Sequence, residues 1–260
     1  MPRPIITLTT DFGQSDPFVG AMKGVLYSVN RDVEIVDISH AVNAFDTLDG
    51  ALTVANAYAY FPNETIHVVV VDPGVGSARR PILVRADAHT FVAPDNGVLS
   101  LVYERSERIS VRHIDAEHYF RQPVSQTFHG RDIFAPVAGW LSKGVEREKF
   151  GDEITDFVRF ALPKPKPVDA NTLKGVVMKV DRFGNLLTNV SPQDVPEGRP
   201  FTVACGKANI TKVARSYAEG APGEPFVILG SSGWYEVSAN KAAANRLVGA
   251  ERGAEVVFRW

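Results

Sequence analysis

The sequence has only one cysteine, Cys205, among its 260 residues. A single cysteine cannot form an internal disulfide or a CxxC metal or redox pair, and this usage is typical of a reducing compartment. No stretch reaches the roughly 18 apolar residues that a membrane-spanning helix needs, and the N-terminal segment lacks the basic and apolar regions of a signal peptide. We therefore expect a mature cytoplasmic protein without a membrane partner.

An excess of positive charge is also missing, because 28 Lys and Arg side chains face 30 Asp and Glu side chains, for a formal net charge of -2. Such a chain has no broad field to attract polyanions, so nucleic acid is not an expected partner. The six histidines are scattered and form no HxH, HExxH or HxxxH pair. We expect no metal site and no cofactor.

The first part of the chain alternates between two hydrophobic patterns. Short β-branched runs predict strands, and apolar residues at three- and four-residue intervals predict helices. In chain order these are strand 4–10, helix 18–29, strand 33–38, helix 46–61 and strand 65–71. The alternation favours a parallel sheet with right-handed crossovers. Shorter elements follow, at 81–86, 89–93, from Val98, at 110–114 and at 132–142.

A proline-rich stretch within 161–172 separates this part from a series of short strands. Prolines at alternate positions exclude a central strand or a helix interior, so we predict a linker at 163–172. We expect an α/β N-terminal domain with a mainly parallel sheet at 1–162. A smaller, antiparallel, β-rich and barrel-like domain is expected at 173–260, with one helix at about 240–248.

Acidic residues follow three predicted strands of the N-terminal domain, at Asp11, Asp72 and Asp95. Ligands of open α/β sheets bind beyond the carboxyl ends of the strands, where such loops converge. Each aspartate alone is also what a turn or helix cap would use. Three of them at one edge favour a binding site there.

The stretch QTFHGRDIF places His129 among apolar residues, where it could be a buried structural residue, a metal ligand or a catalytic group. Without a second histidine at ligand spacing, a metal is disfavoured. A histidine that acts on water needs one aspartate and one cationic neighbour, and Asp72 with Arg79 or Arg80 could supply them. These readings stay open at this level.

Two segments of the C-terminal half also carry polar clusters. DRFGN places Asp181 and Asn185 around a Phe-Gly turn, which a hairpin alone could explain. GSSGWYEVSANKAAANRL combines two serines, an aromatic pair and a glutamate with a helix start capped near Ser238 or Asn240. Capping accounts for one of these polar residues only.

Taken in order, six motifs resemble those of the S-adenosyl-L-methionine (SAM) hydroxide adenosyltransferases, relatives of the fluorinases and chlorinases. The motifs are TTDFGQSD, VDPGVGSARR, APDNG, TFHGRDIFAP, VDRFGNLLTN and SSGWYEVSANKAAANRL, and they cover nearly the whole chain. The resemblance implies a homotrimer whose sites lie between one subunit's N-terminal domain and its neighbour's C-terminal domain. It also implies attack of a water-derived hydroxide on C5′ of SAM, which releases adenosine and methionine.

The resemblance also assigns roles to residues of this chain. Asp72, Arg79 and His129 would handle the water, with Arg79 preferred to Arg80 by its spacing from the aspartate. Asp11, with Asp16 in the same loop, would bind the ribose hydroxyls. The remaining substrate contacts would come from the C-terminal domain: Asp181 for the ammonium, Ser231 and Ser232 for the carboxylate, Glu236 less strongly, and Asn185, Asn240, Lys241, Phe183 or Trp234 around the adenine.

Two other functions remain possible at this level. The halogenating branch holds its halide with a serine-containing loop where this chain has residues 127–130, and it carries an inserted loop that this chain lacks. A hydrogen-bonding triad suits hydroxide better than a bare halide, so hydrolysis is favoured over a halide-dependent synthase. A non-catalytic binder of adenosine or SAM would have no need of His129.

Overall fold

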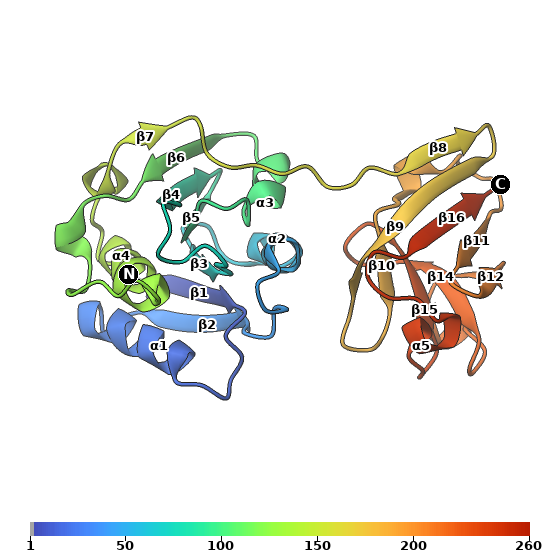
Figure 1. Ribbon diagram of the computed structural model, residues 1–260, viewed down its shortest axis with the longest axis horizontal. Coiled ribbons are helices and arrows are strands. Elements are labelled where there is room, and N and C mark those ends of the chain that lie inside the picture. Colours follow the sequence, from blue (N-terminus) through green and yellow to red (C-terminus); the bar gives the residue numbers. More distant parts are fainter. Residues whose placement is uncertain (1–2) are drawn as a thin grey trace. The chain divides into compact units, whose positions relative to one another are not determined.

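A computed structural model describes residues 3–260 and divides the chain into two compact units (Figure 1). The first unit ends at Phe160 and the second runs from Ala161 to Trp260. Each unit has its own sheet and its own hydrophobic core.

The first unit is built on a seven-stranded mixed sheet. Its strands in spatial order are β2 (Glu34–Ser39), β1 (Ile5–Thr10), β3 (Ile66–Val70), β5 (His89–Pro94), β4 (Pro81–Ala86), β6 (Ile109–His113) and β7 (Glu153–Ile154). The first four are parallel neighbours, as the alternating pattern predicts, and the last three are antiparallel. A two-residue turn joins β4 to β5, and so short a connection forces an antiparallel pair. The expectation of a mainly parallel sheet therefore holds for only part of it.

Helices cover both faces of this sheet (Figure 1). On one face α1 (Phe18–Val29) and α4 (Ala135–Ser142) pack against alternate residues of β1 and β3, such as Leu8 and Val68. On the other, α2 (Thr47–Ala55) and α3 (Ser100–Arg105) pack against the intervening residues, such as Val69. This is the two-residue period of a strand that is buried on both sides.

Two predicted helices are shorter or less regular than their hydrophobic pattern indicates. The range 46–61 is α-helical only to Ala55 and then forms a 3₁₀ turn, Tyr58–Tyr60. The range 132–142 begins inside a π-helical turn, Gly130–Phe134, which leads into α4. Further 3₁₀ turns lie at Glu117–Tyr119, Arg147–Phe150, Pro192–Asp194 and Tyr217–Glu219.

The second unit holds nine strands, and all of its pairs are antiparallel except β13 with β14. The strands are β8 (Lys166–Asp169), β9 (Thr172–Val180), β10 (Leu186–Thr188), β11 (Thr202–Cys205), β12 (Ala208–Ile210), β13 (Val213–Ala214), β14 (Pro225–Leu229), β15 (Tyr235–Ala239) and β16 (Glu255–Arg259). Helix α5 covers only Ala244–Val248, so the expectation of a helix at 240–248 is wrong for its first four residues. Ser238 is not a helix cap, because it lies buried in β15 between β10 and β14.

Part of the stretch expected to be a linker is a strand. Within 163–172, β8 pairs with β9 along one side only and carries Pro167. A proline without a backbone N–H is tolerated at an edge, where one side of the strand needs no partner. The segment 166–169 thus belongs to the second unit's sheet.

Inside the first unit, a hydrogen-bonded chain links three buried side chains of neighbouring strands. Thr7 Oγ1 lies 2.8 Å from His67 Nδ1, and His67 Nε2 lies 3.2 Å from His89 Nδ1. Tyr58 packs edge-on against both imidazoles. Burial, with the nearby His89, lowers the pKa of His67 from 6.5 to about 3. The pair of His67 and His89 is therefore a structural element of the core that requires a neutral His67.

This pKa predicts an acid-dependent loss of stability. As the pH falls below 6.5 the unfolded chain binds a proton at residue 67 before the folded chain does, so stability declines between pH 6.5 and about 3. At pH 5 this one residue accounts for a loss of about 2 kcal/mol in the free energy of unfolding, relative to neutral pH. Between pH 7.5 and 5 the free energy of unfolding of His67→Gln should therefore fall by about 2 kcal/mol less than that of the wild type. Urea denaturation at the two pH values measures this difference. Tyr58→Phe, which keeps both imidazoles, should follow wild type; equal pH dependence in all three proteins would contradict the assignment.

Candidate functional site

A cavity of about 290 Å³ lies at the carboxyl edge of β1 and β3 in the first unit. Asp11 and Asp72, which follow these two strands, line it together with His129 from the turn before α4. Three loops that are distant in sequence thus meet at the sheet edge where α/β proteins bind ligands.

The guanidinium of Arg79 joins the other two groups of the predicted set. Its Nε donates to Asp72 Oδ1 over 3.0 Å, and its Nη2 donates to Asp72 Oδ2. The same Nη2 lies 2.7 Å from His129 Nδ1. All three side chains are nearly buried, and a bidentate pair of this kind is among the strongest hydrogen-bonded arrangements in proteins.

The neighbouring Arg80 points elsewhere. It pairs with Asp95 and with Asp156, at 2.9 and 2.8 Å. Asp95 also accepts a hydrogen bond from the Val158 backbone N–H. Asp95 is therefore engaged in fastening the 156–158 segment. Arg79 is the arginine that contacts Asp72 and His129, and it stands behind these two lining residues without lining the cavity itself.

The arginine determines which nitrogen of His129 carries a proton. A guanidinium can only donate, so Nδ1 must accept, and the neutral imidazole then has its proton on Nε2. The pKa of His129 is lowered, mainly by burial and then by the positive charge of Arg79. The negative charges of Asp72 and Asp132 oppose this shift. At neutral pH His129 is consequently an uncharged Nε2–H donor.

Gly76 allows the loops of this site to lie against each other. The residue has a φ of +75°, and a Cβ there would come within 2.2 Å of the Gln126 carbonyl oxygen. The loop after β3, with Asp72 and Arg79, is thereby pressed onto the segment that leads to His129. Only glycine combines this conformation with this contact.

Of the two acids expected near ribose, only Asp11 lines the cavity. Its Oδ2 accepts the Phe45 backbone N–H over 2.8 Å, which leaves Oδ1 available to a ligand hydroxyl. Asp16 is exposed and does not line the cavity, and its carboxylate accepts a hydrogen bond from the Ser15 hydroxyl over 3.4 Å.

The aromatic wall of the cavity was not predicted from the sequence. Phe12, Phe18 and Phe128 pack with ring centroids 5.3 to 5.9 Å apart. Phe45 adds a fourth ring that is 75% exposed and has a φ of +65°. The sequence signal for this wall was a large aromatic residue in a polar loop. Exposed aromatic residues are common, so this signal alone does not indicate a binding site.

The second unit carries a separate cavity of about 640 Å³. Five of the predicted substrate-binding residues line it: Asp181, Phe183, Asn185, Asn240 and Lys241. Asp181 accepts the backbone N–H groups of Phe183 and Asn185, both at 2.8 Å, and the Asn185 side chain at 2.9 Å. Phe183 is 76% exposed beside this rigid turn. Tyr217, which the sequence argument did not select, also borders the cavity.

The other four predicted residues, Ser231, Ser232, Trp234 and Glu236, do not line this cavity. They belong to the turn before β15 and to its start, where Gly230 N–H donates to the Trp234 carbonyl. Glu236 lies behind Tyr217, whose hydroxyl donates to Glu236 Oε2 over 3.3 Å. Burial raises the pKa of Glu236, and Asp181 adds to this effect while Tyr217 opposes it.

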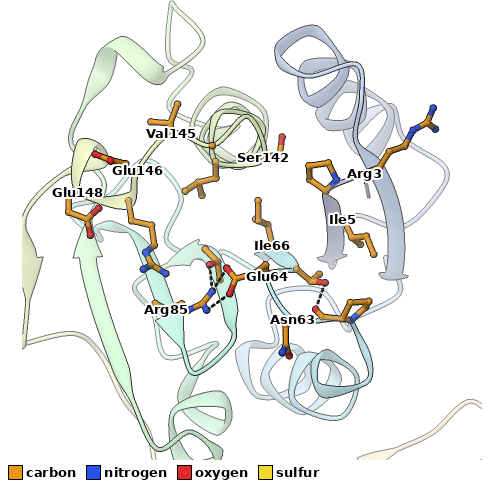
Figure 2. A pocket seen from close by; sticks show the side chains of 17 residues that line it. Arg3, Ile5, Asn63, Glu64, Ile66, Arg85, Ser142, Val145, Glu146 and Glu148 are labelled. Atoms are coloured by element: carbon orange, nitrogen blue, oxygen red, sulfur yellow. Dashed lines mark hydrogen bonds and ion pairs between the residues drawn. The ribbon is translucent and has the colours of Figure 1, made fainter. Parts of the chain in front are cut away.

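A larger cavity of about 760 Å³ lies at the opposite, N-terminal edge of β1 and β3 (Figure 2). Figure 2 shows that its central charges are paired, since Arg85 donates to both carboxylate oxygens of Glu64. None of the predicted site residues lines it. Within residues 3–260 there is no cluster of metal-binding side chains and no helix long and apolar enough to cross a membrane.

Comparison with known proteins matches both units. The profile of the SAM hydroxide adenosyltransferase N-terminal domain covers residues 6–151, and that of the C-terminal domain covers 175–257. A Salinispora tropica protein named (R)-S-adenosyl-L-methionine hydrolase is 35% identical over 97% of this chain and 96% of its own. An Actinoplanes fluorinase is 26% identical, with 92% of each chain covered. A crystal structure from Thermotoga maritima has a TM-score of 0.90 at 33% identity and covers 98% of this chain and 100% of that one.

The contact at Gly76 predicts a large effect of one methyl group. Gly76→Ala should lower the free energy of unfolding by more than the roughly 1–2 kcal/mol that a left-handed backbone alone costs a residue with a Cβ. Gly144→Ala is the matched control, because Gly144 has a φ of +87° and nothing within 4 Å. Denaturant titration of both variants measures the difference. Equal losses would show that the two loops are not in contact at Gly76.

Proposed function

The chain belongs to the SAM hydroxide adenosyltransferase family, and we propose that Asp72, Arg79 and His129 carry out its reaction, the hydrolysis of SAM to adenosine and L-methionine. The single observation that carries the mechanism is the Arg79 guanidinium hydrogen-bonded to both the carboxylate and the imidazole. This arrangement presents one acceptor and one donor to a water molecule.

The substrate makes modest demands on the protein. A sulfonium leaves as a neutral thioether and needs no proton, so catalysis consists of aligning and desolvating the nucleophile. His129 donates its Nε2–H to the water oxygen, and Asp72 accepts one water proton with a lone pair that Arg79 leaves open. The oxygen bonds to C5′ as the C5′–S bond breaks, the electron pair stays on sulfur, and the proton passes to Asp72. Arg79 cannot accept a proton, and His129 Nδ1 is already engaged.

The two cavities divide the substrate between them. Asp11 accepts hydrogen bonds from the ribose hydroxyls, and the aromatic wall excludes water around the reacting carbon. Asn185 with the backbone at Asn240 and Lys241 reads the adenine, and Phe183 packs against it. Trp234 is the alternative to Phe183 for packing near the adenine. Asp181 binds the ammonium, and Ser231 and Ser232 bind the carboxylate, with Glu236 as a weaker candidate at this end. The ribose contact of Asp16 is the weakest of these roles, since its side chain is exposed.

We also propose a homotrimer, which the family resemblance implies. The first cavity, at about 290 Å³, lies at the lower limit for a small-molecule site, so a nucleoside with an amino acid tail needs a second surface. We assign that surface to the C-terminal domain of a neighbouring subunit. Names of relatives favour the R epimer at sulfur. The buried Cys205, whose pKa is raised to about 11, suits a cytoplasmic enzyme.

The assigned roles predict separate effects on turnover and binding. Asp72→Asn and His129→Ala should each lower kcat by about 100-fold or more, because they act on the water, and leave adenosine affinity near wild type. Asn185→Ala should weaken adenosine binding instead. Chromatography of products with and without chloride, together with calorimetric titration of adenosine, measures both. A chloride-dependent 5′-chloro product, or full turnover in both water-handling variants, would refute the proposal.

Sites shared between subunits predict complementation between two impaired chains. Mixed oligomers of His129→Ala and Asn185→Ala chains contain some sites with an intact N-terminal domain from one chain and an intact C-terminal domain from another. Denaturing and refolding the two variants together should therefore restore part of the wild-type activity. Each variant refolded alone is the control. If the mixture is no more active than its two components, each site is built from a single chain.

A further inference from the structure

Asp132 is a charged residue in the first unit that the mechanism above does not use. Its carboxylate is completely buried, in the π-helical turn three residues after His129. Burying a charge is unfavourable unless it is paired and fully hydrogen-bonded. All of the hydrogen-bond donors that satisfy the carboxylate come from one segment of the chain. This suggests that Asp132 fixes the conformation of that segment.

The donors to Asp132 come from both ends of the segment that carries His129. Arg131 donates with Nε at 2.7 Å and Nη2 at 2.8 Å, and Arg121 donates with Nη1 at 3.2 Å. The Ser125 backbone N–H donates to Oδ2 at 2.9 Å, and the Arg121 N–H donates to the Asp132 carbonyl at 2.9 Å. Residues 121–131 therefore form a loop that is closed upon one carboxylate.

The same carboxylate fixes a wall of the cavity. It holds Arg131 so that the guanidinium lies 5.0 Å from the ring centre of Phe128. Phe128 in turn packs against Phe12 and Phe18. The Ser125 N–H held by Asp132 also fixes Ser125, whose hydroxyl accepts the Thr127 N–H at 3.2 Å. Thr127, Phe128 and His129 all line the cavity.

We propose that Asp132 is a positioning residue for the hydrolysis of SAM: its buried carboxylate sets the place of His129 beside Arg79 and of Phe128 beside the substrate. The proposal rests on the proposed function. It goes beyond it because Asp132 does not line the cavity: it acts through Arg131, Ser125 and the backbone, and through the effect of its charge on His129. The arrangement gives the enzyme a rigid loop at the reacting carbon, where small displacements of catalytic groups are costly.

The charge of Asp132 supplies a readout that a purely structural role would lack. The charged groups facing His129 are Arg79, which lowers its pKa, and Asp72 and Asp132, which raise it. Removing the charge at 132 should lower the pKa of His129 further. The acid limb of the kcat/KM profile, where His129 becomes protonated, should then move to lower pH.

The test compares three variants of the full chain with wild type. Asp132→Asn, which keeps the shape and removes the charge, should lower kcat about 10- to 100-fold and shift the acid limb. Arg131→Met, which releases Phe128 but keeps the carboxylate, should mainly raise the KM for SAM. Asp95→Asn is the matched control, because Asp95 is also a buried carboxylate paired with an arginine, Arg80. It should keep the wild-type kcat and pH profile even if it is less stable.

The outcomes distinguish a positioning role of Asp132 from a purely structural one. Wild-type kcat and acid limb in folded Asp132→Asn would overturn the proposal, as would equal losses in Asp95→Asn. If Asp132→Asn does not fold, Arg131→Met decides: wild-type KM and kcat there would leave Asp132 a purely structural role. Absence of adenosine from wild-type enzyme in the same assay would refute the proposed function itself, which separates that failure from a failure at Asp132.

Discussion

The candidate site of the first unit depends on one guanidinium that lies between a carboxylate and an imidazole. Arg79 neutralises the buried charge of Asp72 and at the same time obliges His129 to present Nδ1 as an acceptor. A lysine could provide the charge but not the flat fork that reaches both partners. The protonation state of the site thus follows from geometry, and it yields a neutral donor next to a carboxylate acceptor.

Holding this contact requires two loops that are more than forty residues apart to lie within hydrogen-bonding distance. Gly76 permits the approach from one side and the Asp132 network stiffens the other. Each of these features is local in sequence: the first is a glycine with a left-handed backbone, and the second is a buried ion pair. The parallel strands β1 and β3 beneath them provide a common edge, and the packed helices on both faces keep that edge fixed.

Much of this organisation could be predicted from the sequence, for physical reasons. The stripe of apolar residues in 18–29 gives a helix with those bounds, because amphipathic period and burial agree. The meeting of Asp72 with His129 followed from strand ends and from a resemblance in six motifs. The residues by themselves left Arg79 and Arg80 as alternatives, and only the resemblance favoured Arg79, because adjacent side chains take different partners only once the loop is folded. Likewise Ser238 suits a helix cap by type, yet it pairs with Phe226 of β14 and is buried in β15. The aromatic wall has no period, because its members come from loops and the end of a helix.

The most direct test of this account is the protonation of His129 in the free enzyme at pH 7.5, read from ¹⁵N chemical shifts of ring-labelled histidine. The signal is assigned by its loss in His129→Gln. The account predicts a neutral ring with the proton on Nε2 and an unprotonated Nδ1. A proton on Nδ1, in either a neutral ring or an imidazolium, would mean that Arg79 does not donate to this nitrogen, and the proposed handling of water would fail.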